Sequence, residues 1–347
     1  MRSQVLGIKL NAQCDRLDEI AIRAWGLAVG DRDAAEVLPK WLELGAPMGI
    51  LDPIECVGVF PPVEIGDTDG AGDLHCSLQD WRNYISVEQE PEIALGLLRV
   101  QRDKGHCVFL DTEEDVKSYL RVPSIVVSKM ALISKLKPDG STKHRLIWDL
   151  LRSGVNATVK LGERIVLPRL WDLISDVRDV WTQSGGVPEL LAIDIADAFH
   201  NVPLRTRERR YAVAKISGTY IAFNVMAMGS KSAPGVWGRF AACLGRFVAS
   251  ILAPLNARVE IYVDDPIMVA TGSVHHRSRT FAIGLAAMAS LGFPLAWGKA
   301  SIGHRVVWIG AELTASADSV TVSIPEDKLR ALLEDVYKFL AQKLVAT

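Results

Sequence analysis

The pattern of apolar and polar positions changes character along the chain and predicts a different kind of structure in each part. Over residues 1–44, apolar residues recur at helical spacing on an acidic surface, which predicts helices. Residues 45–75 are rich in Gly, Pro and Asp and predict an irregular connector. A strand over 125–133, a Pro-Asp-Gly turn and a returning strand over 144–148 then predict a β-hairpin with basic residues at its tip.

After this hairpin, short β-branched runs alternate with longer stretches of helical periodicity. The order of strands and helices predicts an α+β fold in which helices cover one face of an antiparallel sheet. The predicted elements are a helix over 167–181, a strand over 190–195, a hairpin over 211–225, a helix over 236–252, a strand over 258–263 with its partner over 267–270, a helix over 274–291, a last strand over 306–313 and a helix over 326–344.

The distribution of charge is uneven, although the net charge of the 347 residues is only −2. Residues 1–98 hold 7 Lys and Arg against 17 Asp and Glu. Residues 115–170 hold 11 Lys and Arg against 4 Asp and Glu, and residues 199–250 hold 8 Lys and Arg against 1 Asp or Glu. Two basic blocks therefore flank an acidic strand end, as a phosphate-backbone track around an acidic metal site requires. Solvated charge on helix faces is the alternative interpretation.

The cysteines and the length of the apolar runs indicate the cellular compartment of the protein. The five cysteines are scattered, without Cys-x-x-Cys spacing, which favours reduced thiols over a disulfide frame or a zinc site. No basic segment followed by an apolar run opens the chain, and no stretch reaches about 18 consecutive apolar residues. We therefore expect a cytoplasmic or nuclear protein that is not secreted and does not associate with a membrane.

Acidic residues follow two of the predicted strands. Asp194 comes at the end of the first, and the adjacent pair Asp264 and Asp265 ends the second. Carboxylates at the tips of neighbouring strands can hold two divalent metals about 4 Å apart, the arrangement that in-line phosphoryl displacement uses. Two adjacent carboxylates in a turn also repel each other unless cations neutralise them. Pro266 removes one backbone donor from the returning strand and puts the hairpin geometry in question.

From about Ile125 to Leu313, these features follow the order of motifs in the reverse transcriptase domain of retroelements such as long-terminal-repeat retrotransposons, and the chain resembles this family. The resemblance implies the palm and fingers of a right-hand polymerase. It implies fingers over 99–185, a palm over 186–313 to which 205–230 adds a fingers segment, and a linker with an incomplete thumb over 314–347. It leaves residues 1–98, an acidic and mostly helical region, without a role.

The resemblance also implies roles for the acidic motifs. Asp194, Ile195, Asp264 and Asp265 correspond to the residues that hold two Mg²⁺ ions, with Mn²⁺ as an alternative ion. Lys299 corresponds to a residue that could protonate the departing pyrophosphate, and a surface lysine is the other interpretation.

Further motifs resemble the substrate-binding parts of the family. Lys143 and Arg145 correspond to the residues that grip the triphosphate, with Lys137 as an alternative helper. Phe199 corresponds to the gate beneath the sugar, where a ring leaves no room for a 2′-hydroxyl, and Ala198 beside it corresponds to a further substrate-binding residue. Asp197 could touch the triphosphate or be a first-turn helix residue, and both interpretations stay open.

Two loops complete the resemblance. Met228, Gly229 and Pro234 correspond to a glycine loop that leads into a helix along template and nucleotide, although Gln or Phe is common where Met228 stands. Trp308-Ile309-Gly310 corresponds to the primer grip, with an ordinary core role as the alternative for Trp308.

The function implied is an RNA-directed DNA polymerase whose partners are an RNA or DNA template with its primer and deoxynucleoside triphosphates. One alternative is an inactive nucleic-acid-binding remnant of a retrotransposon polyprotein. The other is an RNA-dependent RNA polymerase, although that family typically carries an Asp where this chain has Phe199. The oligomeric state stays open.

Overall fold

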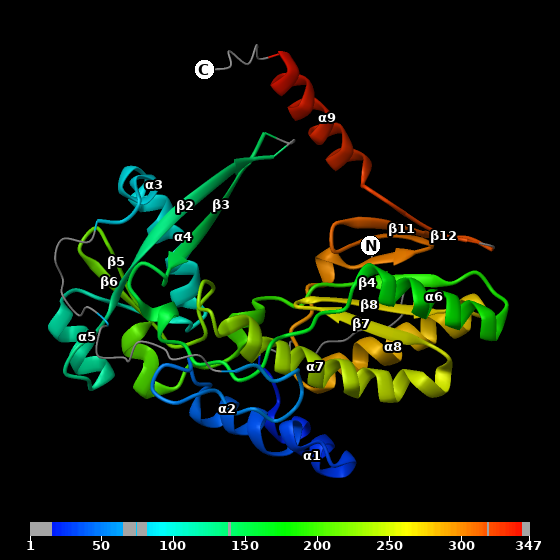
Figure 1. The fold of residues 1–347 in the computed structure, drawn as a ribbon, viewed down its shortest axis with the longest axis horizontal. Coiled ribbons are helices and arrows are strands. Elements are labelled where there is room, and N and C mark those ends of the chain that lie inside the picture. The colour runs from blue at the N-terminus through cyan, green and yellow to red at the C-terminus, as the bar shows by residue number, and fades with distance from the viewer. Residues whose placement is uncertain (1–15, 65–73, 75–81, 138–139, 318, 342–347) are drawn as a thin grey trace. The chain divides into compact units, whose positions relative to one another are not determined.

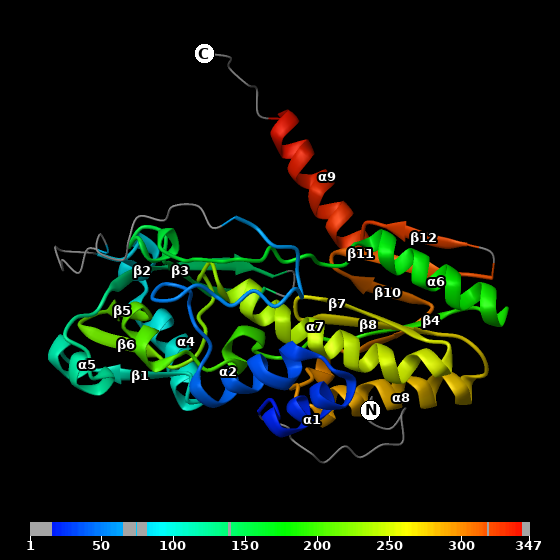
Figure 2. The ribbon, with the colours of Figure 1, turned by 60° about the horizontal axis from the view of Figure 1, so that its bottom comes forward.

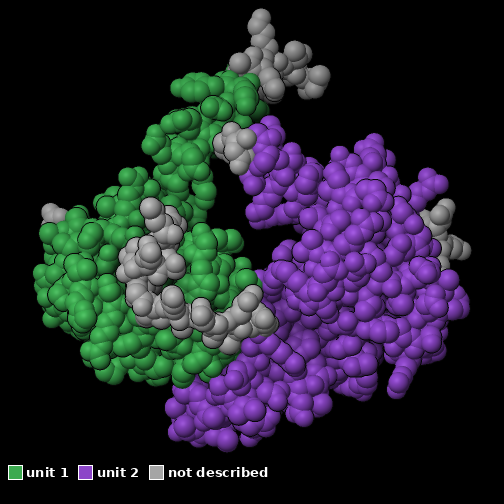
Figure 3. All heavy atoms as spheres, turned by 180° about the vertical axis from the view of Figure 1, so that it is seen from behind, with its two compact units in different colours: residues 1–15, 167–196, 244–347 green, residues 16–166, 197–243 purple. Residues whose placement is uncertain are grey.

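The computed structural model describes residues 16–64, 74, 82–137, 140–317 and 319–341. The chain divides into two compact units, which are coloured separately in Figure 3 and are described one at a time. Unit 1 contains residues 167–196 and 244–347, and unit 2 contains residues 16–166 and 197–243. Parts of four predicted elements lie outside the described residues: residues 1–15 of the N-terminal helical region, 65–73 and 75 of the connector, 138–139 of the Pro-Asp-Gly turn and 342–344 of the last helix.

Unit 2 is built on a five-stranded sheet that contains the predicted basic hairpin (Figure 1). Its strand order is β1 (Cys107–Leu110), β6 (Thr219–Phe223), β5 (Val213–Ile216), β2 (Val127–Leu136) and β3 (Thr142–Asp149). The hairpin is antiparallel from Lys129↔Asp149 to Leu136↔Thr142, whereas β2 and β5 run parallel. The predicted hairpins around residues 138 and 217 are therefore confirmed.

The helices α3 (Ile85–Gln89), α4 (Pro91–Asp103) and α5 (Glu113–Leu120) pack against this sheet. The helices α1 (Glu19–Val29) and α2 (Leu38–Leu44) and the π-helical turn η2 (Asp33–Val37) lie in the N-terminal region, and unit 2 also contains the short turns η4 (Val155–Ala157), η5 (Ala198–Asn201) and η6 (Thr206–Tyr211). Thr112 and Asp115 form a capping box that fixes the start of α5.

The described part of the predicted connector after α2, residues 45–64, is irregular, and two carboxylates hold it in place. The fully buried side chain of Glu208 accepts hydrogen bonds from the backbone N–H groups of Met48, Ile50 and Leu51. Glu163 accepts similar bonds from Val57 and Gly58 further along. Backbone donors that no strand or helix satisfies are thus paired, which fixes the path of the segment.

Unit 1 holds two sheets (Figures 1 and 2). The four-stranded sheet has the order β7 (Arg258–Tyr262), β8 (Asp265–Ala270), β4 (Glu189–Ala192), β9 (Ser301–Gly303), and the three-stranded sheet the order β10 (Arg305–Trp308), β11 (Ala311–Ala315), β12 (Val320–Ser323). The prediction of one strand over 306–313 is wrong in detail. Ile309 and Gly310 take positive φ values of 40° and 87°, so the chain turns back and forms a hairpin.

Helices cover both faces of the four-stranded sheet (Figure 2). On one face lie α8 (Val274–Ser290) and the second half of α7 (Ala233–Leu252), where Gly284 allows close contact with the Met268 sulfur. On the other face, α6 (Leu170–Ser184) and the three-stranded sheet enclose a core that includes Val177, Val269 and Trp308. The sequence predicted helices on one face only. The helix α9 (Glu326–Ala341) follows the second sheet and agrees with the predicted helix over 326–344 as far as the described residues extend.

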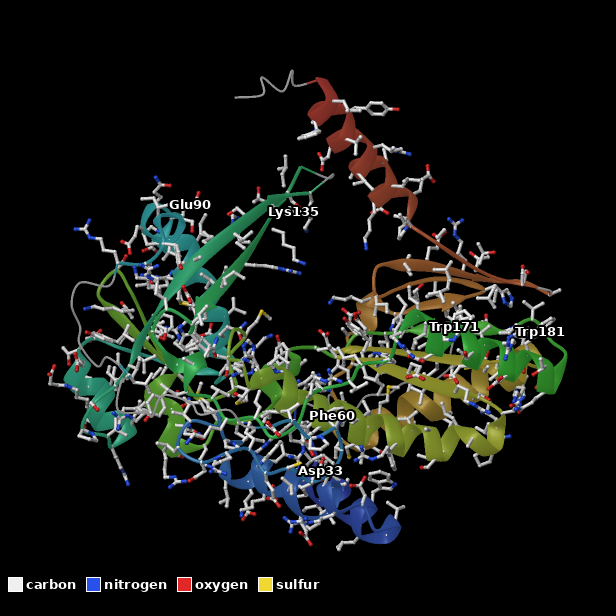
Figure 4. The ribbon with its side chains drawn as sticks, in the orientation of Figure 1. Asp33, Phe60, Glu90, Lys135, Trp171 and Trp181 are labelled. Atoms are coloured by element: carbon white, nitrogen blue, oxygen red, sulfur yellow. The ribbon has the colours of Figure 1, made fainter. Side chains whose placement is uncertain are left out.

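Among the described residues, the segment Ala233–Leu255, which contains α7, is long and apolar enough to cross a membrane by length and composition. However, 56% of its most apolar stretch is buried inside the protein. Within it, the guanidinium of Arg239 forms a buried ion pair with Asp33, which Figure 4 labels in the N-terminal helical segment. These contacts are those of a core helix.

Candidate active site

The two acidic motifs of unit 1 lie side by side because their strands pair. β4 runs antiparallel to β8, with Ala192 opposite Ile267. Beyond this pair, the Ile193 N–H donates to the Pro266 carbonyl over 3.0 Å, and the Ile195 N–H donates to the Asp264 carbonyl over 2.7 Å. The backbone that carries Asp194 is therefore fixed against the turn that carries the acidic pair.

That turn is the tight connection of a β-hairpin. Tyr262 pairs with Asp265, so Val263 and Asp264 form the two-residue connection. Val263 has a φ of 55°, an uncommon conformation for a β-branched residue. Pro266 does not disturb the hairpin, since it pairs with Ile261 and leaves its carbonyl free to accept from the neighbouring strand.

The carboxylates influence one another electrostatically. Burial raises the pKa of Asp265 to about 6, and the charges of Asp264 and Asp194 and a hydrogen bond with Asp194 add to the effect. Burial, together with the charge of Asp194, also raises the pKa of Asp264. Like charges that gather in a partly dry site are the arrangement that a bound cation stabilises.

Lys299 supplies the positive charge in this cluster. It ends the short turn η8 (Trp297–Lys299), which lies beside Asp194 because the Ala296 N–H donates to the Asp194 carbonyl over 2.8 Å. The Lys299 ammonium forms an ion pair with the Asp194 carboxylate, and this hydrogen bond raises the pKa of the lysine. The structure thus brings Lys299 to the predicted carboxylates.

The ligand atoms are not gathered into a finished metal site. Within the part of the chain that the structure describes, no group of three His, Cys, Asp or Glu side chains has metal-ligand geometry. Asp194 and Asp265 are within hydrogen-bond reach, and Asp264 interacts with Asp194 through its charge. The oxygen-only donor set is nevertheless the type that Mg²⁺ prefers.

The predicted primer-grip residues adjoin the acidic turn. Trp308 is 2% exposed, and its indole N–H donates to the Asp265 carbonyl over 2.8 Å. Its ring also meets Tyr262 edge to face at 6.4 Å. Trp308 is therefore a core residue that also braces the carboxylate turn. Ile309 and Gly310 form the turn of the β10–β11 hairpin.

The other predicted binding residues belong to unit 2. Lys143 and Arg145 are exposed at alternate positions of β3, so their side chains leave the same face of the hairpin. The N–H of Lys137, two residues after Lys135, which Figure 4 labels, donates to the Ser141 carbonyl over 2.8 Å. The hairpin presents its cations to solvent, as the triphosphate role requires.

The predicted glycine loop at Gly229 packs closely against the backbone of Trp148. Gly229 has a φ of 110°, and a Cβ atom there would lie 2.5 Å from the Trp148 carbonyl oxygen. The Asn156 side chain further fixes the loop, donating to the Gly229 carbonyl over 2.9 Å and accepting from the Lys231 N–H over 2.8 Å. Met228 is 54% exposed beside it, and Pro234 is the second residue of α7.

The predicted gate lies on η5. Ala198 is buried, and Phe199 is half-buried. Asp197 precedes this turn with a φ of 51°, its side chain does not cap the turn, and its carboxylate forms an ion pair of 2.5 Å with Lys104. Sequence reasoning missed Lys104, because nothing in the sequence links two residues that are 93 positions apart.

A sheet that presents carboxylates from β4 and from the β7–β8 turn, with helices packed on it, is the palm of a right-hand nucleic-acid polymerase. The sequence profile of the reverse transcriptase (RNA-dependent DNA polymerase) family matches residues 135–341, and the chain belongs to this family. The resemblance that the motifs indicate is thereby confirmed.

Solved structures agree on the fold. The chain is similar to the foamy viral protease-reverse transcriptase in complex with RNA/DNA hybrid, with a TM-score of 0.54, 17% identity and 81% of this chain covered. It is similar to the dRH form of that protein in complex with ds DNA, with a TM-score of 0.53, 17% identity and 78% of this chain covered. The chain spans only 33% and 40% of these two proteins. No curated protein matches the chain.

Proposed function

We propose that this protein is an RNA-directed DNA polymerase that adds deoxynucleotides to a primer annealed to an RNA or DNA template. The observation that carries the proposal is the pairing of β4 with β8, which brings Asp194 beside Asp264 and Asp265. Membership of the reverse transcriptase family supports the same reaction class.

The three carboxylates, with the backbone carbonyl of Ile195, would hold two Mg²⁺ ions, or Mn²⁺ in their place. Such ions, when bound, lower the pKa of the primer hydroxyl and stabilise the charge of the leaving pyrophosphate. Asp194 would exchange its ion pair with Lys299 for a metal contact, since both partners satisfy the same negative charge.

The remaining roles belong to side chains of this protein. Lys299, which keeps its proton because its pKa is raised, would donate that proton to the pyrophosphate. Arg145 and Lys143 would bind the triphosphate oxygens, for which a guanidinium offers two parallel donors. Phe199 would exclude a 2′-hydroxyl by filling the space beneath the sugar, and the loop at Met228-Gly229 would lie along the base pair.

A primer-extension assay on a primed RNA template tests the proposal. We expect Mg²⁺-dependent incorporation that Asp264→Asn reduces at least about a hundredfold, because lost electrostatic stabilisation of this kind costs that much. Asp179→Asn, on the exposed side of α6, is the matched control and keeps the rate. Incorporation that survives Asp264→Asn would contradict the proposed site.

A second candidate is an inactive nucleic-acid-binding domain. Two observations favour it. The described side chains do not form a metal site with three ligands, and the Asp194 carboxylate is engaged in an ion pair with the Lys299 ammonium. Template–primer binding without any incorporation, with either deoxy- or ribonucleotides, would support this candidate. Equally efficient use of ribonucleotides would instead support an RNA polymerase.

A further inference from the structure

A cluster of charged and imidazole side chains holds the turn that carries Phe199. The turn between α4 and β1 supplies Lys104 and His106, and the η5 turn supplies Asp197 and His200. The Lys104 ammonium lies 2.5 Å from the Asp197 carboxylate, and the two imidazole rings lie 5.1 Å apart between centroids. These two contacts bracket Phe199, because they involve residues on either side of it.

The α4–β1 turn is itself firmly fixed. His106 bonds the Gln101 side chain through Nδ1 over 2.8 Å, and its backbone N–H donates to the Gln101 carbonyl over 3.0 Å. Its own carbonyl accepts from the Asn224 N–H over 2.8 Å, at the end of β6. The backbone of the turn that carries Lys104 and His106 is therefore fixed to α4 and to the end of β6.

The η5 turn, by contrast, depends on support from outside. Asp197 takes a left-handed conformation that a non-glycine residue adopts only at a cost, and its backbone carbonyl accepts the N–H groups of His200 and Asn201. Burial lowers the pKa of His200 to about 4, so the ring is neutral and packs as an aromatic group near neutral pH. The Lys104 ion pair and the His106 contact thus compensate for local strain.

We propose that Lys104 and His106 are positioning residues that set the place of the sugar gate and so determine the preference for deoxy- over ribonucleoside triphosphates. This inference rests on the proposed function. The gate acts by contact, so a small outward shift of η5 opens room for a 2′-hydroxyl. Lys104 also cancels the charge of Asp197, which makes Asp197 a support of the gate and not a ligand of the triphosphate.

The test compares kcat/KM for a deoxynucleotide and the matching ribonucleotide on one template. Lys104→Met removes the ammonium and keeps the length of the side chain. We expect the deoxynucleotide preference to fall about fivefold, as the loss of one partly exposed ion pair implies. Lys104→Arg should retain most of the preference. Arg99→Met, which breaks an exposed ion pair with Glu92 on the same helix, is the matched control and should leave it unchanged.

A second pair of variants addresses the imidazole contact and covers the case in which Lys104→Met does not fold. His106→Phe keeps a ring against His200 and should keep the preference, whereas His106→Leu should lower it. If a folded Lys104→Met or His106→Leu protein prefers deoxynucleotides as strongly as the wild type does, the inference is wrong while the polymerase assignment stands. If the wild type incorporates neither nucleotide, the proposed function fails, and the inference fails with it.

Discussion

The indole N–H of Trp308 donates a hydrogen bond to the backbone carbonyl of Asp265 over 2.8 Å. This bond joins the three-stranded sheet to the turn that presents the acidic pair. We predict that Trp308→Phe, which removes the donor and keeps most of the ring, lowers the stability of the protein by about 1 kcal/mol. We also expect primer extension to slow several-fold, since Asp265 loses its brace. Trp171→Phe, at a position on α6 that is 66% exposed, is the control for both thermal unfolding and rate.

Lys299 offers a test of the proton donor. Lys299→Met should lower kcat about 100-fold with little change in the KM for the nucleotide, because general acid catalysis contributes about that much. Lys299→Arg should restore only part of the rate, since a guanidinium gives up its proton far less readily. Single-turnover incorporation measures the effect. Lys117→Met, which breaks an ion pair with Glu113 on α5, is the control. An unchanged kcat in Lys299→Met would show that Lys299 is a surface lysine and not the proton donor.

The buried ion pair between Asp33 and Arg239 makes a prediction about the N-terminal region. Arg239 also donates to the Glu55 carbonyl over 2.7 Å and lies over the Trp41 ring at 4.5 Å. Asp33→Asn should therefore cost about 3 kcal/mol in urea unfolding, because it leaves a guanidinium buried without its counter-charge. Arg32→Met breaks an exposed pair with Glu55 and should cost less than about 1 kcal/mol. Equal costs for both variants would contradict a structural role of the buried pair.

The carboxyl pair of Asp176 on α6 and Glu260 on β7 predicts a pH dependence of stability. Burial raises the pKa of Glu260 to about 7 from its ordinary value of 4.5, and the charge of Asp176 adds to the effect. A raised pKa means that the folded state holds the proton more tightly, so this contribution is complete below pH 4.5 and is lost as the pH rises through about 7.

The measurement is thermal unfolding at several pH values between about 5 and 8. We expect the wild type to lose about 1 kcal/mol over this range and Glu260→Gln to lose less, because its amide does not titrate. Glu334→Gln, on the exposed surface of α9, is the control and should follow the wild type. Parallel curves for the wild type and Glu260→Gln would rule out this pair as the source.

The sequence predicted those features that depend on short local patterns, such as strands and turns. Asp194 and Asp264 end β-branched runs, and two such runs pair as neighbouring strands, so their meeting could be foreseen. The basic hairpin could also be predicted, because a Pro-Asp-Gly turn separates two predicted strands, and the two strands do pair. The hydrogen bond between the Trp308 indole and the Asp265 carbonyl could not be predicted, because the sequence does not indicate which acceptor a buried indole N–H contacts.

Contacts between residues far apart in the chain were the ones that sequence reasoning missed. The sequence analysis assigned no role to Lys104, which forms an ion pair with Asp197 in the structure. Gly229 corresponds to the glycine of a loop beside template and nucleotide, yet its closest approach in the structure is to the Trp148 carbonyl oxygen. Such contacts depend on how the elements pack, which periodicity along one segment does not encode.

The central claim is that Asp194, Asp264 and Asp265 together bind a pair of divalent cations. Titration of Mn²⁺ into the protein, with free Mn²⁺ followed by electron paramagnetic resonance, tests this most directly when a terminated primer–template and a deoxynucleotide are present. We predict that the wild type retains two ions in this complex and that Asp194→Asn loses at least one of them, while Asp179→Asn behaves as the wild type. Equal Mn²⁺ binding by the wild type and Asp194→Asn would contradict the account.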